Sequence, residues 1–142
     1  MKKVLVTGCF DLFHYGHLKF FEAAAACGDY LIVGVAEDDT VRRVKGENRP
    51  IYPLEHRIAL IEACRHVASV EVFSLESQLD LVDKVSPDIC VEGADGNARL
   101  REILDELELN IPVQTVYTDY IHTTDIVEKI LNDKSTKHIE NN

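Results

Sequence analysis

The chain has 142 residues, of which 46% are hydrophobic and 28% are charged, a balance typical of one globular domain with a single buried core. Its formal net charge of −10 argues against general affinity for nucleic acid, because a phosphate backbone is bound by a positive surface. The first apolar run, residues 4–7, is too short for a signal peptide or a membrane span, so we expect a cytoplasmic protein with no membrane partner.

Short apolar runs alternate with longer segments of helical periodicity along the whole chain. The expected strands are, in chain order, 4–7, 30–36, 70–73, 89–91 and 113–116. The expected helices are one that passes Leu18 and ends at Gly28, one opened by Pro53, and those near 78–85, 98–107 and 124–131. This alternation predicts parallel β-α-β units and therefore an α/β fold, a Rossmann-like three-layer sandwich with a five-stranded parallel sheet.

No internal repeat or linker divides the chain, so we expect one domain over residues 1–133. Residues 134–142 form a polar tail that we expect to be disordered. The four cysteines are Cys9, Cys27, Cys64 and Cys90. They form no Cys-x-x-Cys pair, and free thiols in a reducing compartment are favoured over a disulfide framework.

Ligands of such folds bind at the carboxyl ends of the strands, so the loops that follow the strands form the candidate site. In the first loop, Gly8 allows a tight turn under a ligand, and the helix that follows presents an N-terminus that favours a phosphate. His14 and His17 project from one side of the first helical turn, and Gly16 between them leaves room for a nucleotide. Two imidazoles so placed can donate hydrogen bonds to a nucleoside triphosphate, and these strengthen as charge develops in the transition state.

The same loop has two other interpretations. One histidine could pack in the core while the other caps the helix. A zinc site of Cys9, His14 and His17 is a further alternative, but the sequence supplies no convincing fourth ligand, so we expect no metal ligands in the chain.

The second loop, residues 37–50, is long enough to be functional or mobile, and Lys45 at its middle could close onto the reacting phosphates. Arg57, one turn into the next helix, could bind a phosphate with a bidentate guanidinium. The alternatives are a solvated lysine and an ion pair of Arg57 with Glu55 or Asp11. The cations gathered in this stretch are Arg42, Arg43, Lys45, Arg49 and Arg57.

The last two loops carry polar residues at the same edge of the sheet. Asp95 lies between two glycines, which suits either a contact with ribose hydroxyls or a simple tight turn. Thr123 and Thr124 precede the last helix, where they could cap it or help its N-terminus hold a phosphate.

Together these segments resemble the His-x-Gly-His nucleotidyltransferase superfamily, the cytidylyltransferase-like α/β proteins. The resemblance spans nearly the whole chain apart from its tail. The matching stretches are GCFDLFHYGH (8–17), GDYLIVGVAEDD (28–39), VKGENRPIYPLEHR (44–57), VEGAD (91–95) and HTTDIVEKI (122–130).

The resemblance implies an enzyme that transfers a nucleoside monophosphate from a nucleoside triphosphate to a phosphorylated small molecule and releases pyrophosphate. It implies direct in-line attack on the α-phosphorus, with Mg²⁺ bridging the triphosphate, and a homodimer. The implied catalytic residues are His14, His17 and Lys45. The implied nucleotide-binding residues are Gly8, Cys9, Phe10, Gly16, Asp95, Thr123 and Thr124, and the implied substrate-phosphate residues are Asp11 and Arg57.

Two branches of the superfamily compete for the substrates. The stretch from KGENRP (45–50) to PLEHR (53–57) is most similar to the adenylyltransferase domain of ADP-heptose synthesis, which implies ATP and a heptose 1-phosphate. HYGH (14–17) is equally similar to glycerol-3-phosphate and phosphoethanolamine cytidylyltransferases, which use CTP. Glycerol-3-phosphate cytidylyltransferases carry an arginine ahead of a Ser-Thr-Thr segment. Residues 118–121 lack it and His122 replaces the serine, which favours the adenylyl branch.

Other classes explain the residues less well. A non-catalytic nucleotide-binding regulator could share the fold but would not need His14, His17 and Lys45 together. Class I aminoacyl-tRNA synthetases carry a signature like His-x-Gly-His, yet this chain is too short, is acidic and has no lysine-rich second signature. A dehydrogenase is not supported, because no G-x-G-x-x-G follows the first strand.

Overall fold

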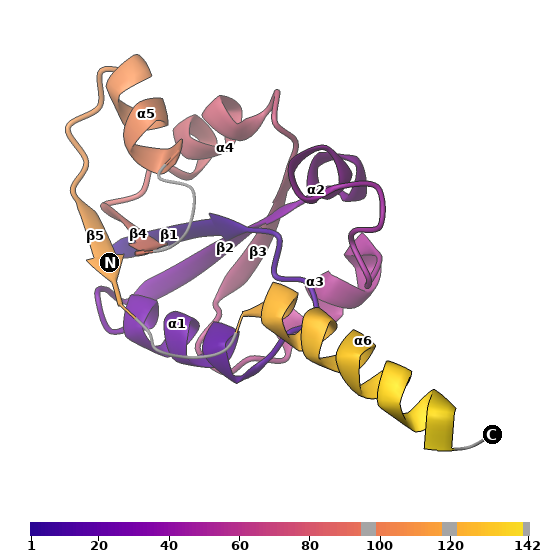
Figure 1. Ribbon diagram of the computed structural model, residues 1–142. Helices are drawn as coiled ribbons and strands as arrows, with labels where there is room; N and C mark the ends of the chain where they lie inside the picture. The colour runs from indigo at the N-terminus through magenta and orange to yellow at the C-terminus, as the bar shows by residue number, and fades with distance from the viewer. Residues whose placement is uncertain (95–98, 118–121, 141–142) are drawn as a thin grey trace.

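The computed structural model describes residues 1–94, 99–117 and 122–140 (Figure 1). Strands and helices alternate through these ranges. The strands are β1 (Lys3–Gly8), β2 (Tyr30–Ala36), β3 (Ser69–Phe73), β4 (Ile89–Gly93) and β5 (Val113–Val116). The helices are α1 (Tyr15–Ala25), α2 (Asp38–Lys45), α3 (Leu54–Glu62), α4 (Gln78–Val85), α5 (Arg99–Glu106) and α6 (Thr123–Glu140).

The strands form one five-stranded sheet in the order β3-β2-β1-β4-β5, and each neighbouring pair is parallel. This confirms the predicted α/β sandwich. The chain first builds the sheet outward from β1 to β3 and then returns to add β4 and β5 on the other side of β1. The strand order therefore reverses between β1 and β4, and ligands of open α/β sheets bind at such a reversal, beyond the carboxyl ends of the strands.

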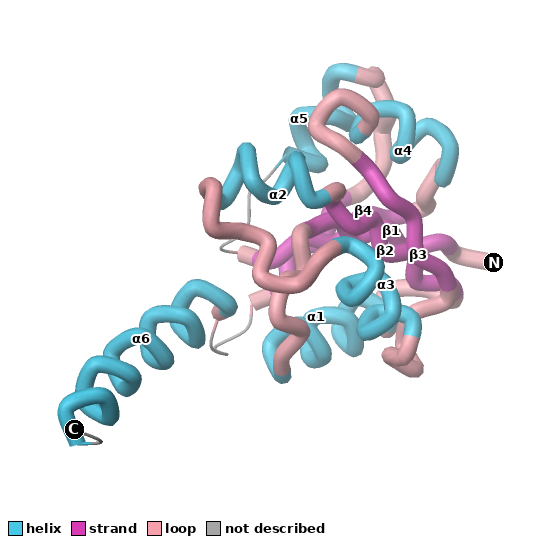
Figure 2. The backbone as a smooth tube through the Cα atoms, turned by 90° about the vertical axis from the view of Figure 1, so that its right-hand side faces the viewer, coloured by secondary structure: helices cyan, strands magenta, loops and turns pink. Residues whose placement is uncertain are grey.

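Helices cover both faces of the sheet. One layer holds α1 and α3, and the other holds α2, α4 and α5 (Figures 1 and 2). Successive residues of β1 enter opposite cores: Val4 and Val6 join the core under α1 and α3, while Leu5 joins the core under α2, α4 and α5. All three are fully buried. Because water reaches neither face, the central strands are apolar at nearly every position.

The structure corrects the expectation of a continuous loop over residues 37–50, because α2 occupies much of it. The segment is mostly charged, and only Thr40 and Val41 of α2 are buried, so it offers few apolar residues to mark a helix. Its charges nevertheless suit a helix: the acidic residues lie in the first turn and the basic ones in the last, where each complements the helix dipole.

The last helix, α6, is longer than expected. It continues to Glu140, whereas the sequence predicted a helix that ends near residue 131. Figure 2 shows α6 extending away from the sheet and its covering helices. Within the described parts of the chain, no helix has the length and apolar character that crossing a membrane requires.

Candidate active site

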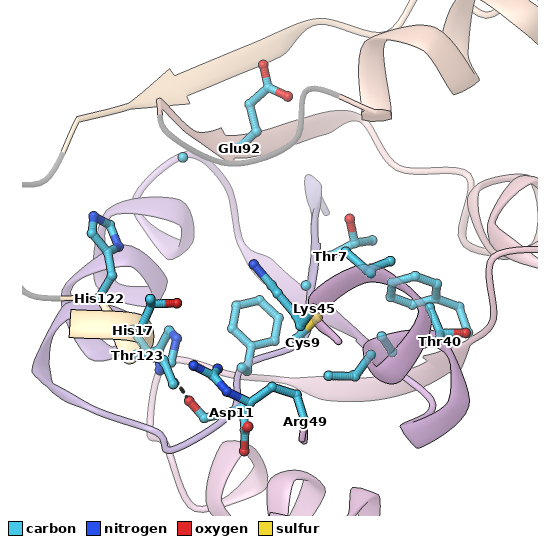
Figure 3. Close-up of a pocket in the computed structure, with 18 of the residues that line it drawn as sticks. Thr7, Cys9, Asp11, His17, Thr40, Lys45, Arg49, Glu92, His122 and Thr123 are labelled. Atoms are coloured by element: carbon cyan, nitrogen blue, oxygen red, sulfur yellow. Dashed lines mark hydrogen bonds between the residues drawn. The ribbon is translucent and has the colours of Figure 1, made fainter. Parts of the chain in front are cut away.

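A pocket of about 580 Å³ opens at the carboxyl edge of the sheet, where the strand order reverses (Figure 3). That volume suits a nucleotide-sized ligand. Its lining comes from the loop after β1, from α2, from the end of β4 and from the start of α6. The predicted site residues that line it are Gly8, Cys9, Phe10, Asp11, His14, His17, Lys45, Thr123 and Thr124. Gly16 and Arg57 do not line it, and Asp95 lies outside the described residues.

Strained backbone shapes the loop between β1 and α1. The left-handed conformation falls on Phe10 (φ 51°) and Leu12 (φ 53°), two residues with large side chains. Gly8, which we expected to provide the tight turn, instead leaves room for the Phe10 ring, since a Cβ on Gly8 would lie 2.8 Å from it. The ring in turn packs edge-on against His17 and Phe21. Such strain persists where packing enforces it, and it is common in ligand-binding loops.

Hydrogen bonds from the backbone fix the tautomers of the two histidines. The N–H of Gly16 donates to His14 Nδ1 (3.0 Å), and the N–H of His14 donates to His17 Nδ1 (3.2 Å). A nitrogen that accepts a hydrogen bond carries no proton, so the proton of each neutral ring sits on Nε2. The backbone N–H of Gly16 therefore orients the His14 ring.

Both imidazoles are neutral at physiological pH. Burial, followed by the charge of His14 and then of His122, lowers the pKa of His17 to about 3. Burial and the charge of His122 also lower the pKa of His14. The His14 and His17 rings stack with their centroids 3.8 Å apart, which disfavours two positive charges. Two Nε2–H groups are thus available as neutral hydrogen-bond donors at the pocket.

The buried, neutral state of His17 predicts a loss of stability in acid. The ordinary pKa of histidine is 6.5 and that of folded His17 is about 3, so between these values the unfolded chain binds the extra proton. The free energy of unfolding therefore falls as the pH decreases through this range. Relative to His17→Gln, the wild type should lose up to about 2 kcal/mol between pH 6.5 and about pH 5. Urea unfolding at both pH values measures this, and equal losses in the two proteins would contradict a neutral buried His17.

Two cations enter the pocket from α2 and the segment that follows it. Lys45 is the last residue of α2, and Arg49 lies four residues further on. Neither forms an ion pair with a carboxylate in the part of the chain that the structure describes. The sequence drew attention to Arg49 only as one of five clustered cations. Its free guanidinium at the pocket makes it a second candidate ligand for phosphate.

Cys9 lines the pocket but is not a candidate nucleophile. Burial raises the pKa of its thiol, although the positive charges of Lys45 and Arg57 oppose the rise. The protonated thiol is a poor nucleophile. Cys9 contributes to the site through its backbone, because its carbonyl accepts a hydrogen bond from Arg57.

Arg57 connects the segments around the pocket through hydrogen bonds and does not line the pocket itself. Its side chain is fully buried. Nη1 donates to the Cys9 carbonyl (2.8 Å), Nε to the Tyr52 carbonyl (3.0 Å) and Nη2 to Asp38 Oδ1 (2.7 Å). This corrects the expectation that Arg57 binds a phosphate, and its ion-pair partner is Asp38 rather than Glu55 or Asp11.

Asp11 lines the pocket and also orders the loops around it. Its carboxylate accepts hydrogen bonds from the backbone N–H groups of Ile51 (2.7 Å) and Tyr52 (2.9 Å). Its carbonyl accepts a hydrogen bond from the Thr123 hydroxyl (2.7 Å). Asp11 therefore joins the loop after β1 to the segment before α3 and to the start of α6.

The N-terminus of α6 faces the same pocket as the two histidines. His122, Thr123, Thr124 and Asp125 all line it. The Asp125 carboxylate caps the helix by accepting a hydrogen bond from the backbone N–H of His122 (3.1 Å). A helix N-terminus favours an anion, so α1 and α6 present two such ends to one pocket.

The described residues contain no group of three or more His, Cys, Asp or Glu side chains that could hold a metal ion. Cys9, His14 and His17, the combination considered for zinc, are among the residues searched. One carboxylate that the sequence did not single out, Glu92 at the end of β4, does line the pocket.

Neutral imidazole donors, uncompensated cations and two helix N-termini surround one α/β pocket, an arrangement suited to binding a polyphosphate. The chain belongs to the cytidylyltransferase-like family, whose family model matches residues 5–139. This confirms the family predicted from the sequence motifs.

Relatives and solved structures agree with this assignment. The bifunctional protein HldE of Campylobacter jejuni subsp. jejuni (serotype O:6, strain 81116) is 36% identical over 137 residues, 94% of this chain and 29% of HldE. HldE of Coxiella burnetii (strain Dugway 5J108-111) is 38% identical over 135 residues, 91% of this chain and 28% of HldE. The chain thus spans less than a third of these curated relatives.

Among solved structures, the lipopolysaccharide core biosynthesis protein from Thermoplasma volcanium GSS1 is similar with a TM-score of 0.74 and 29% sequence identity. The similarity covers 85% of this chain and 99% of that one. Most of the chain, and not a local motif alone, therefore matches a protein of similar size.

Proposed function

We propose that the chain is an adenylyltransferase that uses ATP and a heptose 1-phosphate-type sugar phosphate to form a nucleotide sugar and pyrophosphate. Two comparisons support the sugar phosphate: the similarity to HldE proteins and to a lipopolysaccharide core biosynthesis protein. The observation that carries the chemistry is the buried Nε2 of His14, which lines the pocket without a hydrogen-bond partner. Its N–H requires an acceptor, and a phosphate oxygen meets that need.

In the proposed reaction an oxygen of the sugar phosphate attacks the α-phosphorus of ATP while the bond from the α-phosphorus to the bridging oxygen breaks. The electron pair of that bond leaves with pyrophosphate, and no covalent enzyme intermediate forms. His14 and His17 donate Nε2–H bonds to oxygens on which charge increases in the transition state. Lys45 and Arg49 neutralise the anions that must approach one another.

We propose that Mg²⁺ enters as part of the ATP complex. Bound to triphosphate oxygens and water, it would offset the charge of the departing pyrophosphate. Two carboxylates that line the pocket fit this arrangement, because Asp11 and Asp125 already accept hydrogen bonds from backbone N–H groups.

The proposed assembly is a cytoplasmic homodimer. The four free cysteines fit a reducing compartment. The exposed apolar side chain of Ile130 on the projecting helix α6 supports a partner subunit.

The test is pyrophosphate release in the presence of Mg²⁺ over a grid of substrates. One axis holds ATP, CTP, GTP and UTP, and the other holds heptose 1-phosphate, glycerol 3-phosphate, phosphoethanolamine and flavin mononucleotide. We expect release with ATP and heptose 1-phosphate. Release with CTP and glycerol 3-phosphate would replace the proposal with the cytidylyltransferase alternative, and no release from any pair would overturn both.

A further inference from the structure

Two buried side-chain polar atoms in the described parts of the chain lack a hydrogen-bond partner, and both belong to residues that line the pocket. One is His14 Nε2, the donor assigned to the phosphates. The other is Glu92 Oε2. An unsatisfied buried carboxylate oxygen costs about 1–3 kcal/mol or more, so a native site that keeps one has a use for it.

Glu92 is held rigidly at the end of β4. Its side chain is 11% exposed, and Oε1 accepts a hydrogen bond from Arg101 Nε (3.2 Å) on α5. Arg101 is itself anchored, because its Nη2 donates to the Val113 carbonyl of β5 (3.3 Å). Burial and then the negative charge of Glu92 raise the pKa of Cys90 to about 12, so no second charge forms beside it. One oxygen of Glu92 is thus occupied and the other remains available.

The charge of Glu92 determines which part of a nucleotide can approach it. A carboxylate repels phosphate oxygens and accepts hydrogen bonds only from donors. In Figure 3, Glu92 lies on the side of the pocket opposite Asp11 and Arg49, away from the candidate phosphate ligands. A nucleotide whose triphosphate lies at the histidines would direct its nucleoside toward Glu92. The neutral donors of a nucleoside are the N–H groups of the base and the hydroxyls of the ribose.

We propose that Glu92 is a specificity-determining residue whose free oxygen accepts a hydrogen bond from an N–H or O–H donor of the bound nucleoside. The proposal rests on the nucleotidyltransferase function proposed above. The proposal assigns Glu92 to the nucleoside, for which the sequence had suggested only Asp95. Such a contact discriminates strongly, because a ligand without the donor leaves a buried charge unpaired.

The test measures equilibrium binding of four nucleotides to the wild type, Glu92→Gln and Glu92→Leu by calorimetry. ATP carries the base amino group and both ribose hydroxyls. Inosine triphosphate has a carbonyl in place of the amino group and an N1–H that adenine lacks, and 2′-deoxy-ATP and 3′-deoxy-ATP each lack one hydroxyl. We expect the wild type to bind at least one analogue about tenfold more weakly than ATP. That ratio should fall below about threefold in Glu92→Leu. The analogue that shows the change identifies the donor as the base or the ribose.

Glu92→Gln sharpens the distinction, since its amide can both accept and donate. If the base amino group is the donor, this variant should bind inosine triphosphate better than the wild type does. The matched control is Glu71→Gln. Glu71 lies on the edge strand β3, and its carboxylate forms an exposed ion pair with Lys84 of α4. Thermal unfolding confirms that each variant is folded. If the wild type prefers CTP, the same scheme applies with UTP, 2′-deoxy-CTP and 3′-deoxy-CTP.

The outcomes separate this inference from the function on which it rests. If ATP or CTP binds and the analogue ratios are the same in the wild type and both Glu92 variants, the role of Glu92 is overturned while the nucleotidyltransferase proposal stands. If no nucleoside triphosphate binds the wild type, both are overturned.

Discussion

Replacing His14 or His17 by alanine should lower kcat by about 10²–10³-fold while changing the KM for the nucleotide much less. The reason is the fixed tautomer of each ring, which aims a neutral Nε2–H at the pocket. Such a donor gains most when negative charge develops on the phosphate oxygens, so its removal affects the transition state more than the bound substrate. Steady-state kinetics of pyrophosphate release, with the substrates identified by the grid, measure the effect.

The double variant should lose little more than the worse single variant, because the stacked rings act as one unit. The matched control is His56→Ala on α3, whose side chain is 60% exposed and lies outside the pocket. Its kcat should stay within about twofold of the wild type. A loss confined to KM in both single variants would show that the histidines bind the substrate without assisting the reaction.

Replacing Arg57 by methionine should lower the free energy of unfolding by about 3 kcal/mol. Methionine fills much of the volume but donates no hydrogen bond, so the carbonyls of Cys9 and Tyr52 lose their partner. The loop after β1 would then be less well positioned, and kcat should fall as well. Urea unfolding gives the stability, and the same kinetic assay gives the activity.

Arg43→Met is the control for Arg57→Met, since it makes the same substitution but removes only an exposed ion pair with Glu76. Its effect on stability should be small beside that of Arg57→Met, because exposed ion pairs contribute little. The opposite pattern for Arg57→Met, with unchanged stability and a raised KM for the sugar phosphate alone, would restore Arg57 as a phosphate ligand and refute its structural role.

The sequence predicts the strands well because burial on both faces makes them continuous apolar runs. The observed β2 and β5 have the expected bounds, and β1, β3 and β4 differ only at their ends. Local hydrophobic periodicity does not predict the order of the strands in the sheet. That order follows from general rules for α/β folds. Helix α2 was missed because it is short and mostly charged, with only two buried residues, so its segment was interpreted as a loop.

Within the site, residues that bear a recognisable motif were predicted, and residues whose role depends on tertiary contacts were not. His14, His17 and Lys45 meet at one pocket as expected. Arg57 has the charge of a phosphate ligand, and only its burial against Cys9 and Asp38 reveals its structural role. The unpaired oxygen of Glu92 is equally invisible in sequence, because it depends on which neighbours fail to reach it.

The hydrogen bond from Thr123 to Asp11 joins residues 112 positions apart, and it brings the start of α6 to the loop after β1. Closing so long a segment is entropically costly, so we expect this contact to form late in folding, after the sheet exists. A ligand that binds both helix N-termini would favour the docked position of α6 by mass action. Occupancy of the pocket and the placement of the start of α6 are then thermodynamically linked.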